Sequence, residues 1–291
     1  MKAKFVALLL ITAVVGAALV GYRDLFTLQP FKRQNPYSNV FMATTDHSGA
    51  VYTIADSKTT VRKVDASGTL VYTFKSSEAA LPGAVRMFND IAADDEGNAY
   101  VLVTFLDANG LKVTGEQIIR ISPDGSRSRV LYGAEYDRSE NLFRVGKIRS
   151  LTAADGYVYF FRRDENSASL QRMAVDGNAA SGPETVKTVE MPRDRYLNEL
   201  AGYDADRIYF TTKRGSLFMV TGESATQLYP SAPTGSLQFP SGIEMSDYSR
   251  IYFIDYHTGA VYFLNADLPG YPMEAVLTAD MLAERFPDEE W

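Results

Sequence analysis

Two histidines are the only imidazole groups in this 291-residue chain, and both lie in predicted turns. His47 belongs to TTDHSGA and His257 to DYHTGA, so each is expected to be a solvated turn residue. Neither lies near a G-x-S-x-G or H-E-x-x-H motif, and the chain has no Walker loop. It also has no cysteine, which excludes disulfides, thiolate metal sites and a lipidated cysteine. Serine-hydrolase and zinc-hydrolase chemistry therefore have no support in the sequence.

The charge balance argues against a nucleic-acid partner. Thirty-six acidic residues against 29 basic ones give a net charge of -7, and the bases form no long run that would follow a phosphate backbone. Hydrophobic residues make up 46% of the chain, with 18 tyrosines and 16 phenylalanines. This composition indicates a large core rich in β-strands.

The N-terminus carries an apolar segment, FVALLLITAVVGAALVGY, at residues 5–22. Its length nearly matches the roughly 30 Å hydrocarbon core of a bilayer, and Lys2 and Lys4 place the short end in the cytoplasm. We therefore expect a single-pass anchor in the cell membrane, with the domain outside the cytoplasm. The alternative is a signal peptide cleaved near Gly16–Ala18, which would release a secreted domain. The predicted divisions are an anchor at 1–22, a stalk at 23–38, a folded domain at 39–277 and a short helix or tail at 278–291.

One stretch, residues 88–132, contains four short apolar segments separated by turns rich in Asp, Asn, Gly and Pro. It predicts a four-stranded antiparallel meander. A similar pattern recurs about every 40 to 60 residues, as in propeller blades. Because helical patterns are missing between the strands, we predict an all-β propeller with five clear blades, the alternative being stacked β-sandwiches. The second strands carry tyrosines expected to pack in the core, at positions Tyr52, Tyr100, Tyr159, Tyr209 and Tyr252.

Two segments carry a resemblance to a known class. FPSGIEMSDYSRIYFIDYHTGAVYFLN at 239–265, and FNDIAADDEGNAYV followed by QIIRISPDG, resemble NHL repeats and the related gluconolactonase and regucalcin propellers. The resemblance covers residues 39–277 and implies six blades. The sixth would be divergent, completed by pairing of residues 26–38 with the C-terminal segment, encoded outside this chain, or absent.

In a propeller, the start of each innermost strand faces the central mouth. Aligning the copies on their tyrosines places five residues near this position and three acids beside them. In gluconolactonase-like enzymes, residues at this rim hold a divalent cation, and here Asn89 and Asn198 match the two asparagine ligands. Ser241 replaces the aspartate and no acid stands at the first-blade glutamate position, so we expect no bound metal, with calcium as the alternative. A further expectation is that both asparagines cap the turn entering the strand. The aligned residues are Phe41, Asn89, Arg149, Asn198 and Ser241, with Asp90, Glu199 and Glu244 beside them.

The longest predicted interblade loop spans 133–147, GAEYDRSENLFRVGK. Its residues Tyr136, Leu142 and Phe143 are a candidate partner-binding surface, the alternative being an ordinary solvated loop.

These observations favour a non-catalytic binding, sensing or protein-interaction module displayed outside the membrane, with a protein or glycan ligand. Candidate ligand-binding residues at the mouth are Asn89, Asp90, Arg149, Asn198 and Ser241. One alternative is a metal-dependent, lactonase-like hydrolase or a lyase at the mouth. Another is a subunit of a larger envelope assembly.

Overall fold

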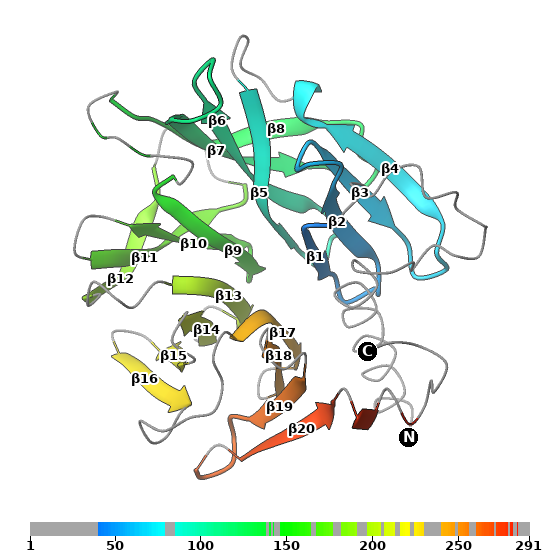
Figure 1. The fold of residues 1–291 in the computed structure, drawn as a ribbon, viewed down its shortest axis with the longest axis vertical. Helices are drawn as coiled ribbons and strands as arrows, with labels where there is room; N and C mark the ends of the chain where they lie inside the picture. The colour runs from blue at the N-terminus through cyan, green and yellow to red at the C-terminus, as the bar shows by residue number, and fades with distance from the viewer. Residues whose placement is uncertain are drawn as a thin grey trace. The chain divides into compact units, whose positions relative to one another are not determined.

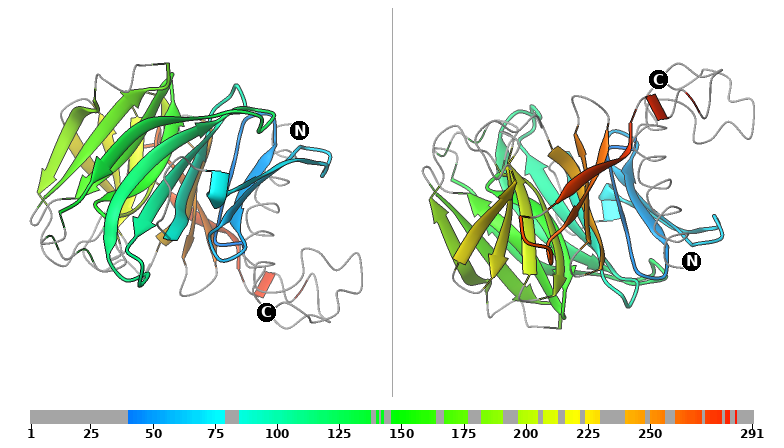
Figure 2. Two further views of the ribbon diagram at one scale, coloured as in Figure 1. Left: turned by 90° about the horizontal axis from the view of Figure 1, so that it is seen from above. Right: turned by 90° about the horizontal axis from the view of Figure 1, so that it is seen from below.

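Twenty strands account for about two thirds of the residues that the structure describes. They form five sheets of four strands, and within each sheet the strands pair in chain order. Figure 1 shows each sheet as a separate group of arrows, and Figure 2 shows the twist of the individual sheets. The predicted all-β propeller is confirmed, with five blades among the described residues. The computed structural model describes residues 40–78, 85–137, 140, 142, 146–163, 167–176, 182–190, 197–204, 207–212, 216–221, 224–229, 240–247, 250–255, 260–270, 272–278, 280, 281 and 284.

The predicted anchor and stalk at residues 1–38 lie outside the described residues, as does most of the C-terminal tail. Within the described part, no helix has both the length and the apolar character needed to cross a membrane.

The element bounds follow the sequence pattern closely. The first sheet contains β1 (Met42–Thr45), β2 (Val51–Ala55), β3 (Thr60–Val64) and β4 (Leu70–Lys75), followed by a 3-10 turn, η1 (Ser76–Glu78). The second contains β5 (Val85–Ala93), β6 (Ala99–Leu106), β7 (Val113–Ile121) and β8 (Ser128–Glu135). The third contains β9 (Ile148–Ala154), β10 (Tyr157–Arg163), β11 (Ser167–Ala174) and β12 (Glu184–Glu190). The fourth contains β13 (Leu197–Asp204), β14 (Arg207–Thr212), β15 (Leu217–Thr221) and β16 (Ser224–Tyr229). The fifth contains β17 (Pro240–Asp247), β18 (Arg250–Asp255), β19 (Val261–Asn265) and β20 (Met273–Leu277).

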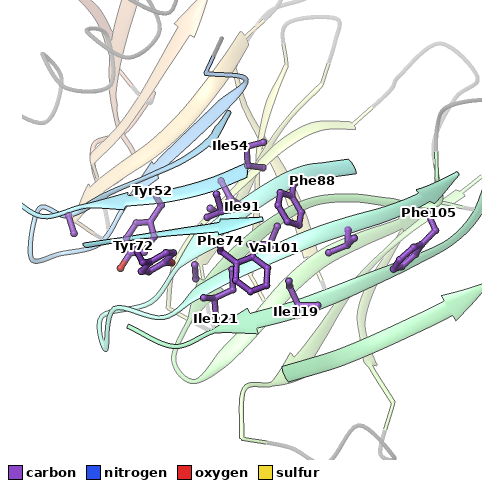
Figure 3. Close-up of a cluster of buried hydrophobic side chains, with 14 residues drawn as sticks. Tyr52, Ile54, Tyr72, Phe74, Phe88, Ile91, Val101, Phe105, Ile119 and Ile121 are labelled. Atoms are coloured by element: carbon purple, nitrogen blue, oxygen red, sulfur yellow. The ribbon is translucent and has the colours of Figure 1, made fainter. Parts of the chain in front are cut away.

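The chain divides into two compact units. The first comprises Met1–Val158 with Met173–Glu184, and the second Tyr159–Arg172 with Thr185–Trp291. In the first unit, the facing sides of the first two sheets form a continuous apolar core (Figure 3). Phe74 of β4 and Phe88 of β5 lie with their ring centroids 6.2 Å apart. Because β6 is covered on both sides, all eight of its residues are buried.

The second unit has a core of the same kind. Tyr209 of β14 and Leu217 of β15 pack in one cluster with Ile251 and Phe253 of β18. In both units a sheet therefore buries a face against a neighbouring sheet, which a meander needs because a single four-stranded sheet is only marginally stable by itself.

The tyrosine pattern is explained by burial and by the turns that precede the strands. Tyr52 and Tyr100 are fully buried. Their hydroxyls donate to the carboxylate six residues earlier, at 2.7 Å from Asp46 and 2.6 Å from Asp94. Each aspartate also accepts backbone N–H groups of its own turn. The Asp-x-x-Gly segments are thus hairpin turns whose aspartate also pairs with the buried tyrosine.

Core positions are confirmed for Tyr159 and Tyr209 as well, which are fully buried. Tyr252 differs because it is only half-buried. Its ring packs at 5.3 Å from that of Phe263 on the neighbouring strand β19.

Candidate ligand-binding site

The turn between β2 and β3 has an unusual backbone. Asp56, Ser57 and Lys58 have φ angles of 52°, 58° and 66°, so three successive non-glycine residues are left-handed. This conformation costs about 1–2 kcal/mol per residue. The turn is held by a hydrogen bond from Thr59 N to Ala55 O at 3.1 Å, and by one from Phe88 N to Lys58 O at 2.7 Å. The second bond attaches the turn to β5, the innermost strand of the next sheet.

This attachment brings the Lys58 side chain to one of the predicted mouth residues. Lys58 Nζ donates to Asn89 Oδ1 at 3.1 Å, and Asn89 Nδ2 donates to Thr104 Oγ1 at 2.6 Å. Lys58 Nζ also lies 5.8 Å from the centroid of the Phe41 ring, in cation–π range. Phe41 remains 44% exposed, and Lys58 and Asn89 are half-buried. An ammonium, an amide and an aromatic ring therefore form one partly open group.

The charges around Lys58 act in opposite directions. Partial burial lowers the pKa of Lys58, the nearby Asp90 carboxylate acts to raise it, and the Arg149 guanidinium acts to lower it. Arg149, on β9, is half-buried and its charge also reaches Glu116. Two cations thus lie close enough in the first unit to influence one another.

Asn89 occupies a β-bulge. The register of β5 on β6 shifts between Phe88 and Asp90, so Asn89 is the extra residue. It lies inside the strand rather than in the turn before it, and its amide bonds the side chains of Lys58 and Thr104. The expectation that Asn89 caps the entering turn is therefore wrong. Corresponding register shifts occur in β13 between Leu197 and Leu200 and in β17 between Ser241 and Glu244.

The carboxylates beside these bulges connect successive innermost strands. Asp90 accepts from Ile91 N at 2.8 Å through Oδ1 and from Leu151 N, on β9, at 2.7 Å through Oδ2. In the second unit, Glu199 Oε2 accepts from Ile243 N, on β17, at 3.2 Å. Asp90 was predicted as a ligand-binding residue, but both of its oxygens accept main-chain N–H bonds. It links β5 to β9, and its charge acts on Lys58.

A second buried carboxylate, Glu116 on β7, continues the polar group inward. It is 1% exposed, and its Oε2 accepts from Tyr136 Oη at 2.5 Å, Lys147 N at 2.8 Å and Ile148 N at 2.9 Å. Its Oε1 lies 3.5 Å from Thr104 Oγ1. Burial raises the pKa of Glu116 although these donors and the Arg149 charge act to lower it. Glu116 therefore anchors both ends of the segment between β8 and β9.

This anchor changes the interpretation of the predicted partner-binding loop. Tyr136 is half-buried with its hydroxyl on Glu116, and the carbonyl of Leu142 accepts from Val113 N at 2.8 Å. Both residues therefore tie the loop to β7. Phe143 lies outside the described residues.

The structure brings together the predicted residues of the first unit, namely Phe41, Asn89, Asp90 and Arg149. The side chains of Asn198 and Ser241, on β13 and β17, lie outside the described part, as does His257. His47 is an exposed turn residue that pairs with Asp95. Sequence reasoning missed Lys58 and Glu116. The signal for Lys58 was its hairpin turn, ADSKT, which lacks the expected glycine or asparagine. The signal for Glu116 was its place as the single acid in the strand β7.

The donor set does not suit the calcium ion that the gluconolactonase resemblance implies. Asn89 Oδ1 already accepts from an ammonium group, and both Asp90 oxygens accept main-chain N–H bonds. A cation would also face the Lys58 and Arg149 charges. Among the described residues, no three His, Asp or Glu side chains are grouped so that they could hold a metal.

The fold of this chain is similar to that of several solved propeller structures. A streptogramin B lyase matches with a TM-score of 0.52 and 16% identity, over 86% of this chain and 72% of the lyase. Virginiamycin B lyase from Staphylococcus aureus matches with a TM-score of 0.52 and 15% identity, over 84% and 72%. A Bacteroides thetaiotaomicron protein of unknown function matches with a TM-score of 0.54 and 16% identity, over 82% and 58%. Neither protein-family models nor curated protein sequences give a match. At these identities the comparison shows the fold, and the chain is a β-propeller with structural neighbours that include streptogramin B lyase.

Proposed function

We propose that this chain is a membrane-anchored, extracytoplasmic propeller that binds a ligand without transforming it, at the group formed by Phe41, Lys58, Asn89 and Arg149. The observation that carries the proposal is that several residues with energetically unfavourable backbone conformations lie at this group. Asp56, Ser57 and Lys58 are all left-handed, and Asn89 is a bulge residue. Ser150, directly after Arg149, also has a positive φ of 47°. Backbone strain of this kind persists where it serves a function.

The roles of the two carboxylates favour binding over catalysis. Asp90 and Glu116 accept main-chain N–H bonds from β9 or from the residue before it, so their oxygens hold strands together. Lys58, Asn89 and Phe41 are the partly exposed members, and their groups suit contact with a ligand. The extracytoplasmic location rests on the apolar segment at 5–22 and the lysines before it.

A second candidate is a lyase or hydrolase acting at the same place. It is favoured by one observation: burial and Arg149 lower the pKa of Lys58. A lysine whose pKa is lowered gives up its proton more readily than an ordinary lysine, which is what a general base requires. Two of the structural neighbours are named as lyases.

One experiment separates these candidates. The full chain, in detergent or nanodiscs, is screened by thermal shift against glycans, peptides and small acids, and each bound compound is recovered and examined by mass spectrometry. A binder returns its ligand unchanged, and Asn89→Ala weakens binding whereas Asn109→Ala, in the exposed β6–β7 turn, does not. Conversion of a bound compound, lost in Lys58→Met, would instead establish an enzyme.

The loop at 133–147 remains a second proposed contact surface, for a protein partner. Because the Tyr136 hydroxyl anchors the loop, we assign the contacts to Leu142 and Phe143 and a supporting role to Tyr136. Pull-down with Phe143→Ala tests this assignment. Capture of the same partner by the variant and the wild type would contradict it.

A further inference from the structure

We infer that Glu116 controls the contact between Lys58 and Asn89: protonation of Glu116 turns the Asn89 amide over and releases Lys58. The inference gives the proposed ligand-binding group a pH-dependent switch, and it rests on the proposed function for the role of that group. Its basis is a continuous row of hydrogen bonds. Lys58 Nζ donates to Asn89 Oδ1 at 3.1 Å, and Asn89 Nδ2 donates to Thr104 Oγ1 at 2.6 Å. The Thr104 hydroxyl donates in turn to Glu116 Oε1 at 3.5 Å.

The direction of each bond in this row is set by groups that can only donate. An ammonium has no acceptor, so Asn89 must present Oδ1 to Lys58 and Nδ2 to Thr104. The Thr104 oxygen therefore accepts from Asn89, and its single hydrogen is left for Glu116. Thr104 and Glu116 are each 1% exposed, so bulk water does not replace a partner that either side chain loses.

The same reasoning fixes where a proton binds on Glu116. Its Oε2 accepts the main-chain N–H groups of Lys147 and Ile148 at 2.8 and 2.9 Å, and these groups can only donate. It also accepts the Tyr136 hydroxyl at 2.5 Å. The proton therefore goes to Oε1, which faces Thr104. There it meets the hydroxyl hydrogen of Thr104, so two donors face each other across one contact.

Two rearrangements can relieve this conflict, and the burial of the groups decides between them. Among the described residues, the Thr104 hydroxyl bonds only Asn89 and Glu116, so turning it away leaves a buried donor without an acceptor. If the Asn89 amide turns over instead, Oδ1 accepts from Thr104 and Lys58 loses its acceptor. Lys58 and Asn89 are half-buried, so water can solvate the released ammonium and the reversed amide. The amide turn is therefore the favoured response.

The groups around Glu116 place this switch above pH 4.5. Burial raises the pKa of Glu116 above that ordinary value, although the hydrogen bonds to Oε2 and the Arg149 charge act to lower it. Lys58 is therefore released as the pH falls through the folded pKa of Glu116. The titratable and charged groups near this row, among the described residues, come from the loop, from β9 and from the Lys58 side: Tyr136, Lys147 with its partner Glu140, Arg149, Asp90 and Lys58.

The test follows the reactivity of Lys58 in the full chain, in nanodiscs, without any ligand. Acetic anhydride labels the lysines, and mass spectrometry gives the rate at Lys58 divided by the rate at the exposed Lys75. Below the pKa of both amines their neutral fractions fall in parallel, so this ratio changes only when the surroundings of Lys58 change. As the pH falls through the folded pKa of Glu116, the ratio should rise about tenfold, because the ammonium loses its hydrogen bond.

Three variants separate the hydrogen-bond row from a simple change of charge. Thr104→Val removes the hydroxyl and keeps the Glu116 carboxylate, so the ratio should stay constant with pH, whereas Thr104→Ser should keep the rise. Glu116→Gln directs an NH₂ group toward Thr104 at every pH, so its ratio should be high and constant. A second measurement needs only the wild type: with 15N-labelled asparagine, the side-chain NH₂ signal of Asn89 should shift with the same midpoint as the Lys58 ratio.

A ratio that stays constant with pH in the wild type, or that rises equally in a folded Thr104→Val variant, would overturn the inference. An Asn89 signal that does not move would also overturn it. If any of these results appears while a ligand binds in an Asn89-dependent way, the inference is wrong and the proposed function stands. If the switch is observed and no ligand binding depends on Asn89, the proposed function is wrong and the switch stands.

Discussion

Replacement of Glu116 tests whether this carboxylate anchors the segment that joins β8 and β9. In Glu116→Ala, the N–H groups of Lys147 and Ile148 lose their acceptor at 2.8 and 2.9 Å. An unsatisfied buried donor costs about 1–3 kcal/mol, so the free energy of unfolding should fall by about 2–6 kcal/mol. In Glu116→Gln, the side-chain carbonyl can keep these bonds while the NH₂ group faces Thr104 Oγ1. We expect a change of at most about 1 kcal/mol in this variant.

The same pair of proteins isolates a pH effect. Burial raises the pKa of Glu116 above the ordinary value of 4.5, so the folded state binds this proton more tightly than the unfolded state does. The contribution to stability is therefore lost as the pH rises above 4.5 through the folded pKa. The stability of the wild type, measured relative to Glu116→Gln, should fall as the pH rises above 4.5.

Urea unfolding followed by circular dichroism at several pH values measures both effects, with constant m-values as the check on two-state behaviour. Glu135→Ala and Glu135→Gln, at the exposed end of β8, are the matched controls and should change stability little. The reasoning is refuted if Glu116→Ala is as stable as the wild type. It is also refuted if Glu116→Gln shows the same pH dependence as the wild type.

Three other substitutions test neighbouring features by the same unfolding assay. A Cβ at Gly146 would lie 1.9 Å from Glu116 Oε1, so Gly146→Ala should lower the free energy of unfolding by more than about 2 kcal/mol. The loss should be smaller in a Glu116→Ala background, and additive losses from the two substitutions would contradict the contact. Asp90→Ala should cost about 1–3 kcal/mol and speed hydrogen exchange of the Leu151 amide, whereas unchanged exchange would show that the link between β5 and β9 is dispensable. Ser57→Gly should stabilise the protein by up to about 1 kcal/mol, because glycine adopts its φ of 58° without strain; a loss of stability would mean that the turn is not strained.

The blade pattern was predictable because it depends on local alternation and on turn residues. Asp46 with Tyr52 and Asp94 with Tyr100 are pairs six residues apart, so one hairpin contains both the turn and the buried tyrosine. Aligning the repeats placed Asn89 and Arg149 at corresponding positions of two first strands, and the structure has them on β5 and β9. The prediction left the blade number open between five and six; the described residues form five, and residues 26–38, which could complete a sixth, lie outside them.

The sequence by itself determined the strands, their grouping in fours and the candidate residues on or beside the innermost strands, since these depend on neighbours within one hairpin. Only the tertiary structure decided what those residues do. Lys58 reaches Asn89 across 31 positions because a turn of one sheet bonds the first strand of the next. Asp90 links two strands because its partner, Leu151, comes from another blade. Such contacts depend on bulges, on the register between strands and on packing between sheets, none of which has a signature in a single stretch of sequence.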